Sequence, residues 1–217
     1  MDAEKIRMVL ELNKKFYANL GERFFSTRQN PWPGWERAIK EIEVHPRSVL
    51  DLGCGNGRFE KFLRIILPKN SFSYLGVDQT NQLPKGPSFK KLNIFTELDK
   101  LNQKFDLVVA FGVTHHIPGK KLREKWFTEI SKLSDKYIVL TFWNFLDKKP
   151  QKAKGLEKND YFLGWRSTKA RRYCHFYDEN ELYKIKEIFR NNDFELISEF
   201  ESDRLNKYHV YKKSFTV

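Results

Sequence analysis

Cysteine is scarce in this 217-residue sequence, which contains only Cys54 and Cys174. Two thiols form neither a disulfide framework nor a four-thiolate zinc site, so we expect a reduced protein without a bound metal. The sequence also lacks an apolar run of the roughly 18 residues that a membrane helix needs. Its charged first residues lack the apolar core of a signal peptide. We therefore predict a cytoplasmic protein of one domain that does not associate with membranes.

Acidic residues are fewer than basic ones. The chain has 40 Lys and Arg against 28 Asp and Glu, a formal net charge of +12 at pH 7. Such an excess favours a polyanionic partner, most commonly a nucleic acid. A lysine-rich, solvated surface without such a partner is the alternative. The charge is also uneven, because nine basic and three acidic residues between positions 147 and 172 carry half of the net charge.

The stretch 147–177 places aromatic residues between its basic ones. Basic groups can neutralise phosphates, and flat rings can stack on unpaired bases. The presence of Pro150, Gly155 and Gly164 argues against regular secondary structure. A long irregular insert in a compact domain is usually functional or disordered. We therefore predict that residues 147–177 are an irregular substrate-binding insert, with the aromatic residues Tyr161, Phe162, Trp165 and Tyr173.

Apolar periodicity predicts strands that alternate with helices along most of the chain. The first helix is expected to end at Gly21 and to be followed by an irregular aromatic segment over 22–34. Helices are predicted at 4–20, 35–43, 58–67, 119–133 and 178–190. Strands are predicted at 48–52, 72–77, 88–92, 105–111, 137–142, 194–200 and 208–215.

This alternation is typical of an α/β fold with a doubly wound, mostly parallel sheet. The last two strands leave no room for a helix between them, so they should form an antiparallel C-terminal hairpin in a seven-stranded sheet. We divide the single domain into four regions. They are an N-terminal helical substrate or lid region (1–46), a cofactor-binding core (47–146), the insert (147–177), and a C-terminal helix and hairpin (178–217).

A glycine-rich loop, Gly53-Cys54-Gly55-Asn56-Gly57, follows the first strand. It differs from the dinucleotide fingerprint because its third glycine comes one residue early and Arg58 stands in the expected place. The acid before it, Asp51, would repel a phosphate but suits a cationic amino-acid group. Asp78 ends the second strand, where a carboxylate can accept hydrogen bonds from both ribose hydroxyls. A tight strand-to-helix turn without a ligand is the alternative.

These residues resemble those of the class I S-adenosylmethionine-dependent methyltransferases, over about residues 47–142. The resemblance implies a Rossmann-like fold and S-adenosyl-L-methionine as the cofactor, with Asp78 holding its ribose. It places the methionine part along the glycines, near Asp51. Where the family often has an acid for the adenine amine, this chain has Asn93. The implied cofactor-binding residues are Asp51, Gly53, Cys54, Gly55, Gly57, Asp78, Gln79, Asn93 and Phe111.

Two adjacent histidines, His115 and His116, follow the fourth strand, beside the expected position of the transferred methyl group. Many methyl acceptors carry a proton at neutral pH, and a histidine can act as the base that removes it. A core contact and a loop hydrogen bond are the alternative roles. An acceptor that is already an anion needs no base, and the histidines would then position it or line the site.

A narrower resemblance extends over about residues 16–182, to the tRNA wobble-uridine methyltransferases that esterify 5-carboxymethyluridine. Departures from that family's pattern include Cys174, where a tyrosine is more common, and the lack of a proline before Trp165. The motifs that carry the resemblance are Phe24-Phe25-Ser26-Thr27-Arg28, Pro31-Trp32-Pro33, the glycine loop, His115-His116-Ile117, and the blocks 160–167 and 171–177.

This resemblance implies a tRNA methyltransferase that forms a carboxymethyl ester on the wobble uridine, with the anticodon loop as its partner. A carboxymethyl group has a pKa of about 4 and is therefore already ionised at neutral pH. Arg28, Arg172 and His175 are candidate donors to it. Trp165 and Tyr173 are candidates for stacking on bases. Thr27 and Arg166 complete the implied substrate-binding set.

Alternatives for these residues are phosphate contacts, structural ion pairs and packing of the insert. Eukaryotic members of the resembled family work with a small zinc-containing activator protein. Two further functions stay open from the sequence. One is a methyltransferase of small-molecule acceptors, for which the basic insert is incidental. The other is a catalytically silent protein that uses the fold to bind RNA or a partner.

Overall fold

The computed structural model describes residues 1–80, 83–166 and 168–214. Its central sheet has the strand order β3-β2-β1-β4-β5-β10-β9. The first five strands in the chain are parallel, and β10 pairs antiparallel with both β5 and β9. The predicted parallel sheet with its terminal hairpin is therefore confirmed. The strands are β1 (Ser48–Leu52), β2 (Ser73–Asp78), β3 (Phe89–Lys91), β4 (Phe105–Ala110), β5 (Ser134–Trp143), β9 (Phe194–Ser202) and β10 (Asn206–Lys213).

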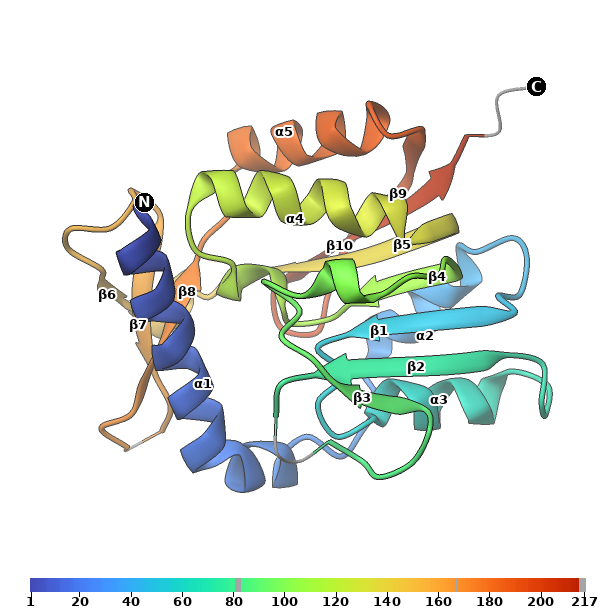
Figure 1. Cartoon of the computed structure of the whole chain (residues 1–217), viewed down its shortest axis with the longest axis horizontal. Coiled ribbons are helices and arrows are strands. Elements are labelled where there is room, and N and C mark those ends of the chain that lie inside the picture. Colours follow the sequence, from blue (N-terminus) through green and yellow to red (C-terminus); the bar gives the residue numbers. More distant parts are fainter. Residues whose placement is uncertain (81–82, 167, 215–217) are drawn as a thin grey trace.

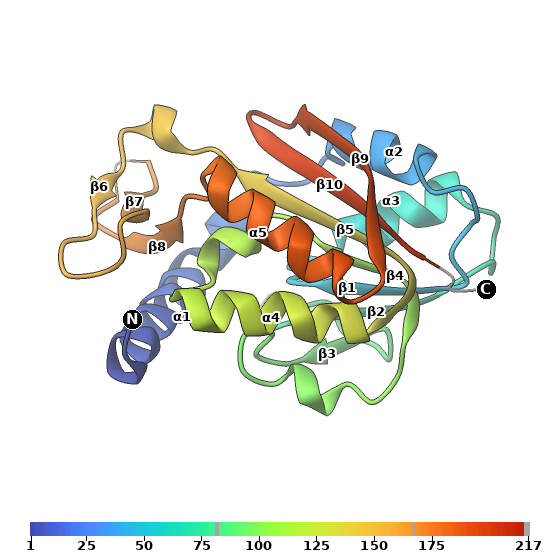
Figure 2. The same ribbon diagram turned by 90° about the horizontal axis from the view of Figure 1, so that it is seen from above.

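Two helical layers cover the sheet, one on each face (Figure 2). On one face lie α2 (Pro33–Lys40) and α3 (Arg58–Ile66), which pack on Val49 and Val109. On the other lie α4 (Lys120–Lys132) and α5 (Glu179–Arg190), which pack on Leu50 and Val108. Neighbouring strand residues thus face opposite layers, which explains the continuous apolar runs of β1 and β4.

The N-terminal helix α1 (Ala3–Ser26) is longer than predicted. The expected stop at Gly21 is wrong, and residues 22–26 of the supposedly irregular segment are helical. The Asp2 side chain caps its start by accepting from the Lys5 N–H at 2.8 Å. Gly21 is buried inside the helix, and Phe24 beyond it is buried too, so the apolar face continues past the glycine. Packing against the insert therefore outweighs the helix-breaking tendency of one glycine.

The insert is folded, contrary to the prediction of irregular structure. It forms a three-stranded antiparallel sheet of β6 (Gln151–Lys152), β7 (Asp160–Gly164) and β8 (Arg171–His175). Helix α1 packs against β8, and both lie beside the central sheet (Figure 1).

Short 3₁₀ helices connect several of the strands: η1 (Leu98–Lys100), η2 (Thr114–His116) and η3 (Leu146–Lys148). Two predicted features extend beyond the described residues, because Ser167 ends the block 160–167 and Phe215 ends the last predicted strand. Within the described ranges, no helix is both long and apolar enough to cross a membrane.

Candidate cofactor and acceptor site

A cleft of about 1350 Å³ lies at the carboxyl ends of the parallel strands, where ligands of open α/β sheets bind. Residues of α1, the glycine loop, η2 and the insert line it together. Most of the predicted site residues share this cleft: Thr27, Arg28, Asp51, Gly53, Cys54, Gly55, Asp78, Gln79, Phe111, His115, His116, Trp165, Arg166 and Arg172.

The glycine loop requires glycine at the residues that face the cleft. Gly53 and Gly55 have positive φ angles of 76° and 55°. A Cβ atom on Gly53 would lie 2.3 Å from the Val113 side chain, and one on Gly55 would lie 2.7 Å from the Phe25 ring. Only glycine therefore fits at these two positions, and both residues line the cleft. Gly57 does not line the cleft and instead stands at the N-cap position of α3.

Two buried acids support this loop. The Asp78 carboxylate accepts from the Gly55 N–H at 2.9 Å and from the Thr80 N–H at 2.8 Å, so it joins the end of β2 to the loop. Burial raises the pKa of Asp78. The Asp51 carboxylate accepts from the Tyr74 hydroxyl at 2.5 Å, and burial raises its pKa to about 7. Near neutral pH, a cationic ligand group beside Asp51 would favour its ionised form.

The structure does not place Asn93 on the cleft wall, where the adenine contact was predicted. Its side-chain oxygen accepts from the Phe95 N–H at 3.0 Å, and its own N–H donates to Glu97 at 2.8 Å. The amide thus organises the turn after β3. Ile94 and Phe95 line the cleft in its place.

Both histidines of η2 are buried and held neutral. The Tyr17 hydroxyl donates to Nε2 of His116 at 2.8 Å, and Nδ1 of the same ring lies 2.9 Å from the Tyr173 carbonyl oxygen. Burial lowers the pKa of His116 to about 3. It also lowers the pKa of His115 well below its usual value. Within the part of the chain that the structure describes, Nδ1 of His115 has no hydrogen-bond partner. Such histidines bind protons weakly at neutral pH, which disfavours a role as general base.

Arg172 of β8 is 4% exposed and lines the cleft. Its Nε and Nη1 atoms have no hydrogen-bond partner among the described residues. Its guanidinium carbon lies 5.0 Å from the Phe16 ring centre and 5.7 Å from that of Trp143. No carboxylate of the described residues forms an ion pair with it. A buried cation with free donors is a receptor for an anion.

A second arginine, Arg28, lies close to the aromatic rings that surround Arg172. Arg28 lies over the Phe24 ring at 3.4 Å, and its Nη1 donates to the Thr27 hydroxyl at 3.0 Å. Burial lowers the pKa of Arg28 to about 10, and repulsion from other cations, Arg172 among them, acts in the same direction. Trp165 is 5.9 Å from Phe24, between ring centres. The cleft therefore concentrates positive charge next to aromatic rings.

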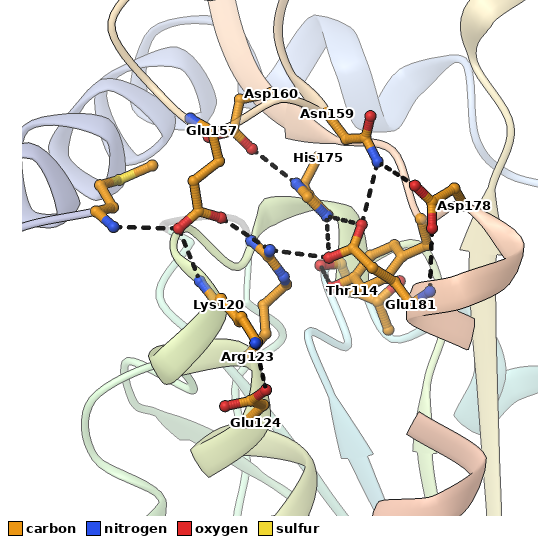
Figure 3. Close-up of polar contacts among 12 residues, drawn as sticks. Thr114, Lys120, Arg123, Glu124, Glu157, Asn159, Asp160, His175, Asp178 and Glu181 are labelled. Carbon is orange, nitrogen blue, oxygen red and sulfur yellow. Dashed lines mark hydrogen bonds and ion pairs between the residues drawn. The ribbon is translucent and has the colours of Figure 1, made fainter. Parts of the chain in front are cut away.

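Tyr173 and His175 do not reach the cleft, so their predicted contacts with substrate need correction. The Tyr173 side chain is fully buried and donates its hydroxyl proton to Asp160 at 2.7 Å. His175 points to Asp160 at 2.7 Å and to Glu181 at 3.0 Å (Figure 3). Alternate residues of a strand face opposite sides, so Arg172 faces the cleft while Tyr173 and His175 face away from it.

Several residues that line or support the cleft were missed by the sequence analysis. Asn13 is 2% exposed, and its side-chain oxygen accepts from the Tyr173 N–H at 2.7 Å. A polar residue on the apolar face of α1, between Val9 and Phe16, was the available signal. Lys149 was predicted only as part of the basic insert, and no local pattern pointed to Arg204. The cleft residues that were not predicted individually include Tyr17, Trp143, Lys149 and Arg204.

Comparisons with known proteins agree with this geometry. A family model described as "Methyltransferase domain" matches residues 14–199. A candidate methyltransferase of Encephalitozoon cuniculi is 27% identical over 177 residues, which cover 79% of this chain and 82% of that protein. The tRNA (carboxymethyluridine(34)-5-O)-methyltransferase of Schizosaccharomyces pombe is 25% identical over 117 residues, 52% of this chain. The match covers 48% of that relative, about half of its length.

Solved structures share the fold at low sequence identity. The PH0226 protein of Pyrococcus horikoshii is 15% identical, with a TM-score of 0.64 over 99% of this chain and 100% of that one. The CalS10 methyltransferase of Micromonospora echinaspora, solved with bound S-adenosylmethionine, is 14% identical, with a TM-score of 0.61. That match covers 90% of this chain and 97% of CalS10.

Proposed function

The chain belongs to the methyltransferase domain family, and from this premise we propose that it methylates a carboxylate on tRNA. The proposed acceptor is 5-carboxymethyluridine at the wobble position, and the product is its methyl ester. The methyl donor of this S-adenosylmethionine-dependent family is S-adenosyl-L-methionine. The proposed partner is the anticodon loop of the tRNA.

The residues at the carboxyl ends of β1 and β2 fit this cofactor. The loop leaves no room for a Cβ atom at Gly53 or Gly55, so its backbone can approach a ligand closely. Asp78 stands at the end of β2, where an acid suits a ribose. Asp51 is suited to a cationic amino group, because ionisation of its buried carboxyl would then be compensated.

The main observation in favour of the proposed acceptor is the buried Arg172 in the cleft. When bound, the cofactor supplies a methyl group on a sulfonium, which a carboxylate oxygen accepts as the carbon–sulfur bond breaks, without removal of a proton. Arg172 would hold that carboxylate with its two free nitrogen atoms. The low pKa values of His115 and His116 agree with an acceptor that needs no base. These two rings then line the site.

The names of distant relatives support the RNA part of the proposal, because one of them is a tRNA carboxymethyluridine methyltransferase. The unpaired cations of the cleft support it as well. A small carboxylic acid is the second candidate acceptor, since Arg172 lies deep enough in the cleft to bind one without any RNA contact.

The test uses S-adenosyl-L-methionine with a labelled methyl group and tRNA that carries 5-carboxymethyluridine. We expect label in the tRNA, which mild alkali then releases as methanol, because an ester is hydrolysed there. The same tRNA with unmodified uridine is the control and should stay unlabelled. The assay is run with and without a small zinc-containing activator of the kind used by the resembled eukaryotic enzymes. Label that resists alkali would contradict a carboxylate acceptor.

A further inference from the structure

Three basic residues of the cleft have a backbone conformation that side chains rarely adopt. Lys149, Arg166 and Arg204 have φ angles of 48°, 53° and 59°. They are the only Lys or Arg residues with positive φ in the described ranges, and all three line the cleft. Left-handed backbone at residues other than glycine, asparagine or aspartate is strained and concentrates at functional sites.

The three residues come from separate turns that meet at this cleft. Lys149 ends the short helix η3 after β5, and Arg166 lies in the loop between β7 and β8. Arg204 stands in the turn between β9 and β10. We call these three residues the cationic rim.

Hydrogen bonds of the residues on both sides of Arg204 fix the turn between β9 and β10. The carbonyl oxygen of Leu205 accepts from the Asn144 N–H at 2.9 Å. The Asp203 carboxylate accepts from the Gly34 N–H at 3.3 Å and from the Tyr208 hydroxyl. These contacts fix the strained turn at the cleft, so the position of Arg204 follows from the fold.

The rim differs from the buried Arg172 and from those surface cations that are held in ion pairs. Its three side chains are exposed, and no carboxylate of the described ranges forms an ion pair with them. Many helical cations are paired, as Lys40 is with Glu36 at 2.8 Å. Solvated, unpaired cations at the border of a cleft suit phosphates, which keep much of their hydration when bound.

We propose that the cationic rim of Lys149, Arg166 and Arg204 holds the phosphate backbone of an RNA acceptor. This inference rests on the proposed function. It assigns two parts of the RNA acceptor to two different groups of residues. The buried Arg172 takes the carboxylate of one modified base, and the exposed rim takes the phosphates around it.

A single small acceptor would leave the rim without a role, because its one carboxylate is matched by Arg172. An RNA is favoured over an acidic protein because an aromatic ring accompanies the cations. The Arg166 guanidinium lies 5.0 Å from the Trp165 ring centre. A ring at this position can stack on an unpaired base of a loop.

The test replaces all three rim residues by glycine: Lys149→Gly, Arg166→Gly and Arg204→Gly. Glycine adopts the left-handed region readily, so the turns should keep their shape and the melting temperature should not fall. The control removes the same charge elsewhere on the surface, with Arg47→Ala, Lys69→Ala and Lys125→Ala. These three control residues are exposed and do not line the cleft.

Binding of a fluorescent anticodon stem–loop RNA is measured against salt concentration by anisotropy. We expect the rim variant to bind at least tenfold more weakly than wild type at low salt. The slope of log affinity against log salt should shrink by about 2, since each single-strand phosphate contact contributes about 0.7. The control variant should bind within about threefold of wild type. If both variants lost the same RNA affinity, the effect would be one of net charge alone, and the inference would be wrong. A lower melting temperature of the rim variant would also contradict it.

Methylation of free 5-carboxymethyluridine nucleoside separates this inference from the proposed function. The rim variant should lose far more methylation of tRNA than of the free nucleoside, because the nucleoside has no phosphate. If the rim variant formed the ester on tRNA as fast as wild type does, the role of the rim would be contradicted, and the proposed function would not. Rim-dependent RNA binding without any ester would support the rim and contradict the proposed function. A wild type that does not bind the stem–loop would contradict both.

Discussion

At the scale of single residues, aromatic rings face the charge of Arg172, but no carboxylate of the described residues pairs with it. The guanidinium is always ionised, yet Arg172 is 4% exposed, and two of its nitrogen atoms have no hydrogen-bond partner in the described ranges. A buried charge without a partner destabilises the folded protein. Its presence in the cleft is explained if an anionic ligand group supplies the missing acceptor.

We therefore predict that Arg172→Met separates activity from stability. Ester formation should fall by about 30-fold or more, because loss of one partner of a buried charged hydrogen bond costs about 2 kcal/mol or more. The melting temperature should stay the same or rise. Initial rates and thermal unfolding test this, with Arg7→Met as the control, since Arg7 is exposed and does not line the cleft. Undiminished activity of Arg172→Met would refute the assigned role.

Asp51 makes a second residue-scale prediction, about pH. Its pKa is raised from 3.8 to about 7 in the fold, so between about pH 4 and 7 the folded state keeps a proton that the unfolded state has released. The contribution of Asp51 to the free energy of unfolding therefore decreases as pH rises through this window. The full loss is at most about 4 kcal/mol.

The Asp51→Asn variant isolates this contribution. Asparagine can still accept from the Tyr74 hydroxyl, but it does not titrate. The lowered pKa values of His115 and His116 act in the opposite direction, since they make unfolding harder as pH rises toward 6.5. The difference between wild type and variant cancels these histidines. Urea unfolding at pH 5 and pH 8 should show wild type losing more stability than the variant, and equal pH profiles would count against the prediction.

At the scale of elements, local sequence predicted the central sheet and failed for the insert. Every buried residue of β1 and β4 except Asp51 is apolar, so these two strands could be recognised from the sequence. The strands β6–β8 depend on partners far along the chain. The Tyr173 N–H donates to Asn13, and Glu157 accepts from Arg123. A window of neighbouring residues contains none of these contacts, and its glycines suggested a loop instead.

The candidate site was predictable to the same extent. The glycine loop and Asp78 belong to a strand–loop–helix unit whose geometry follows from a short motif. The substrate side required knowing that residues 171–175 form a strand. Once they do, Arg172 and Tyr173 cannot face the same cleft. The rim cations required knowing where three separate turns meet.

Asn13 links two elements, and we predict that its removal loosens α1 from the insert. Asn13→Ala leaves the Tyr173 N–H buried without its acceptor, which costs about 2 kcal/mol. The melting temperature should fall by about 4–8 °C. Hydrogen exchange should increase in α1 and β8 more than in the central sheet. Lys15→Ala, on the exposed face of the same helix, is the control and should change neither.

At the scale of the whole molecule, the cleft joins regions that are far apart in the sequence. Residues of α1, the core, the insert and the terminal hairpin all line it. A ligand bound there contacts several of these regions at once, so it should stabilise the folded chain as a whole. By mass action, a ligand present at a hundredfold excess over its dissociation constant adds about 2.7 kcal/mol to the free energy of unfolding.

We predict that S-adenosyl-L-methionine at that excess raises the melting temperature by about 5–10 °C in a chain of this length. A nicotinamide dinucleotide should leave it unchanged, because the loop lacks the dinucleotide spacing. The Gly55→Ala variant should lose the shift, since its new Cβ atom would approach the Phe25 ring to 2.7 Å. Gly155→Ala is matched in strain, with a φ of 78°, but its Cβ atom meets nothing within 4 Å. Gly155→Ala should therefore keep the full shift in melting temperature. The shifts of wild type and of both variants are measured by differential scanning fluorimetry. A Gly55→Ala variant that responded like wild type would contradict the assignment of this loop to the cofactor.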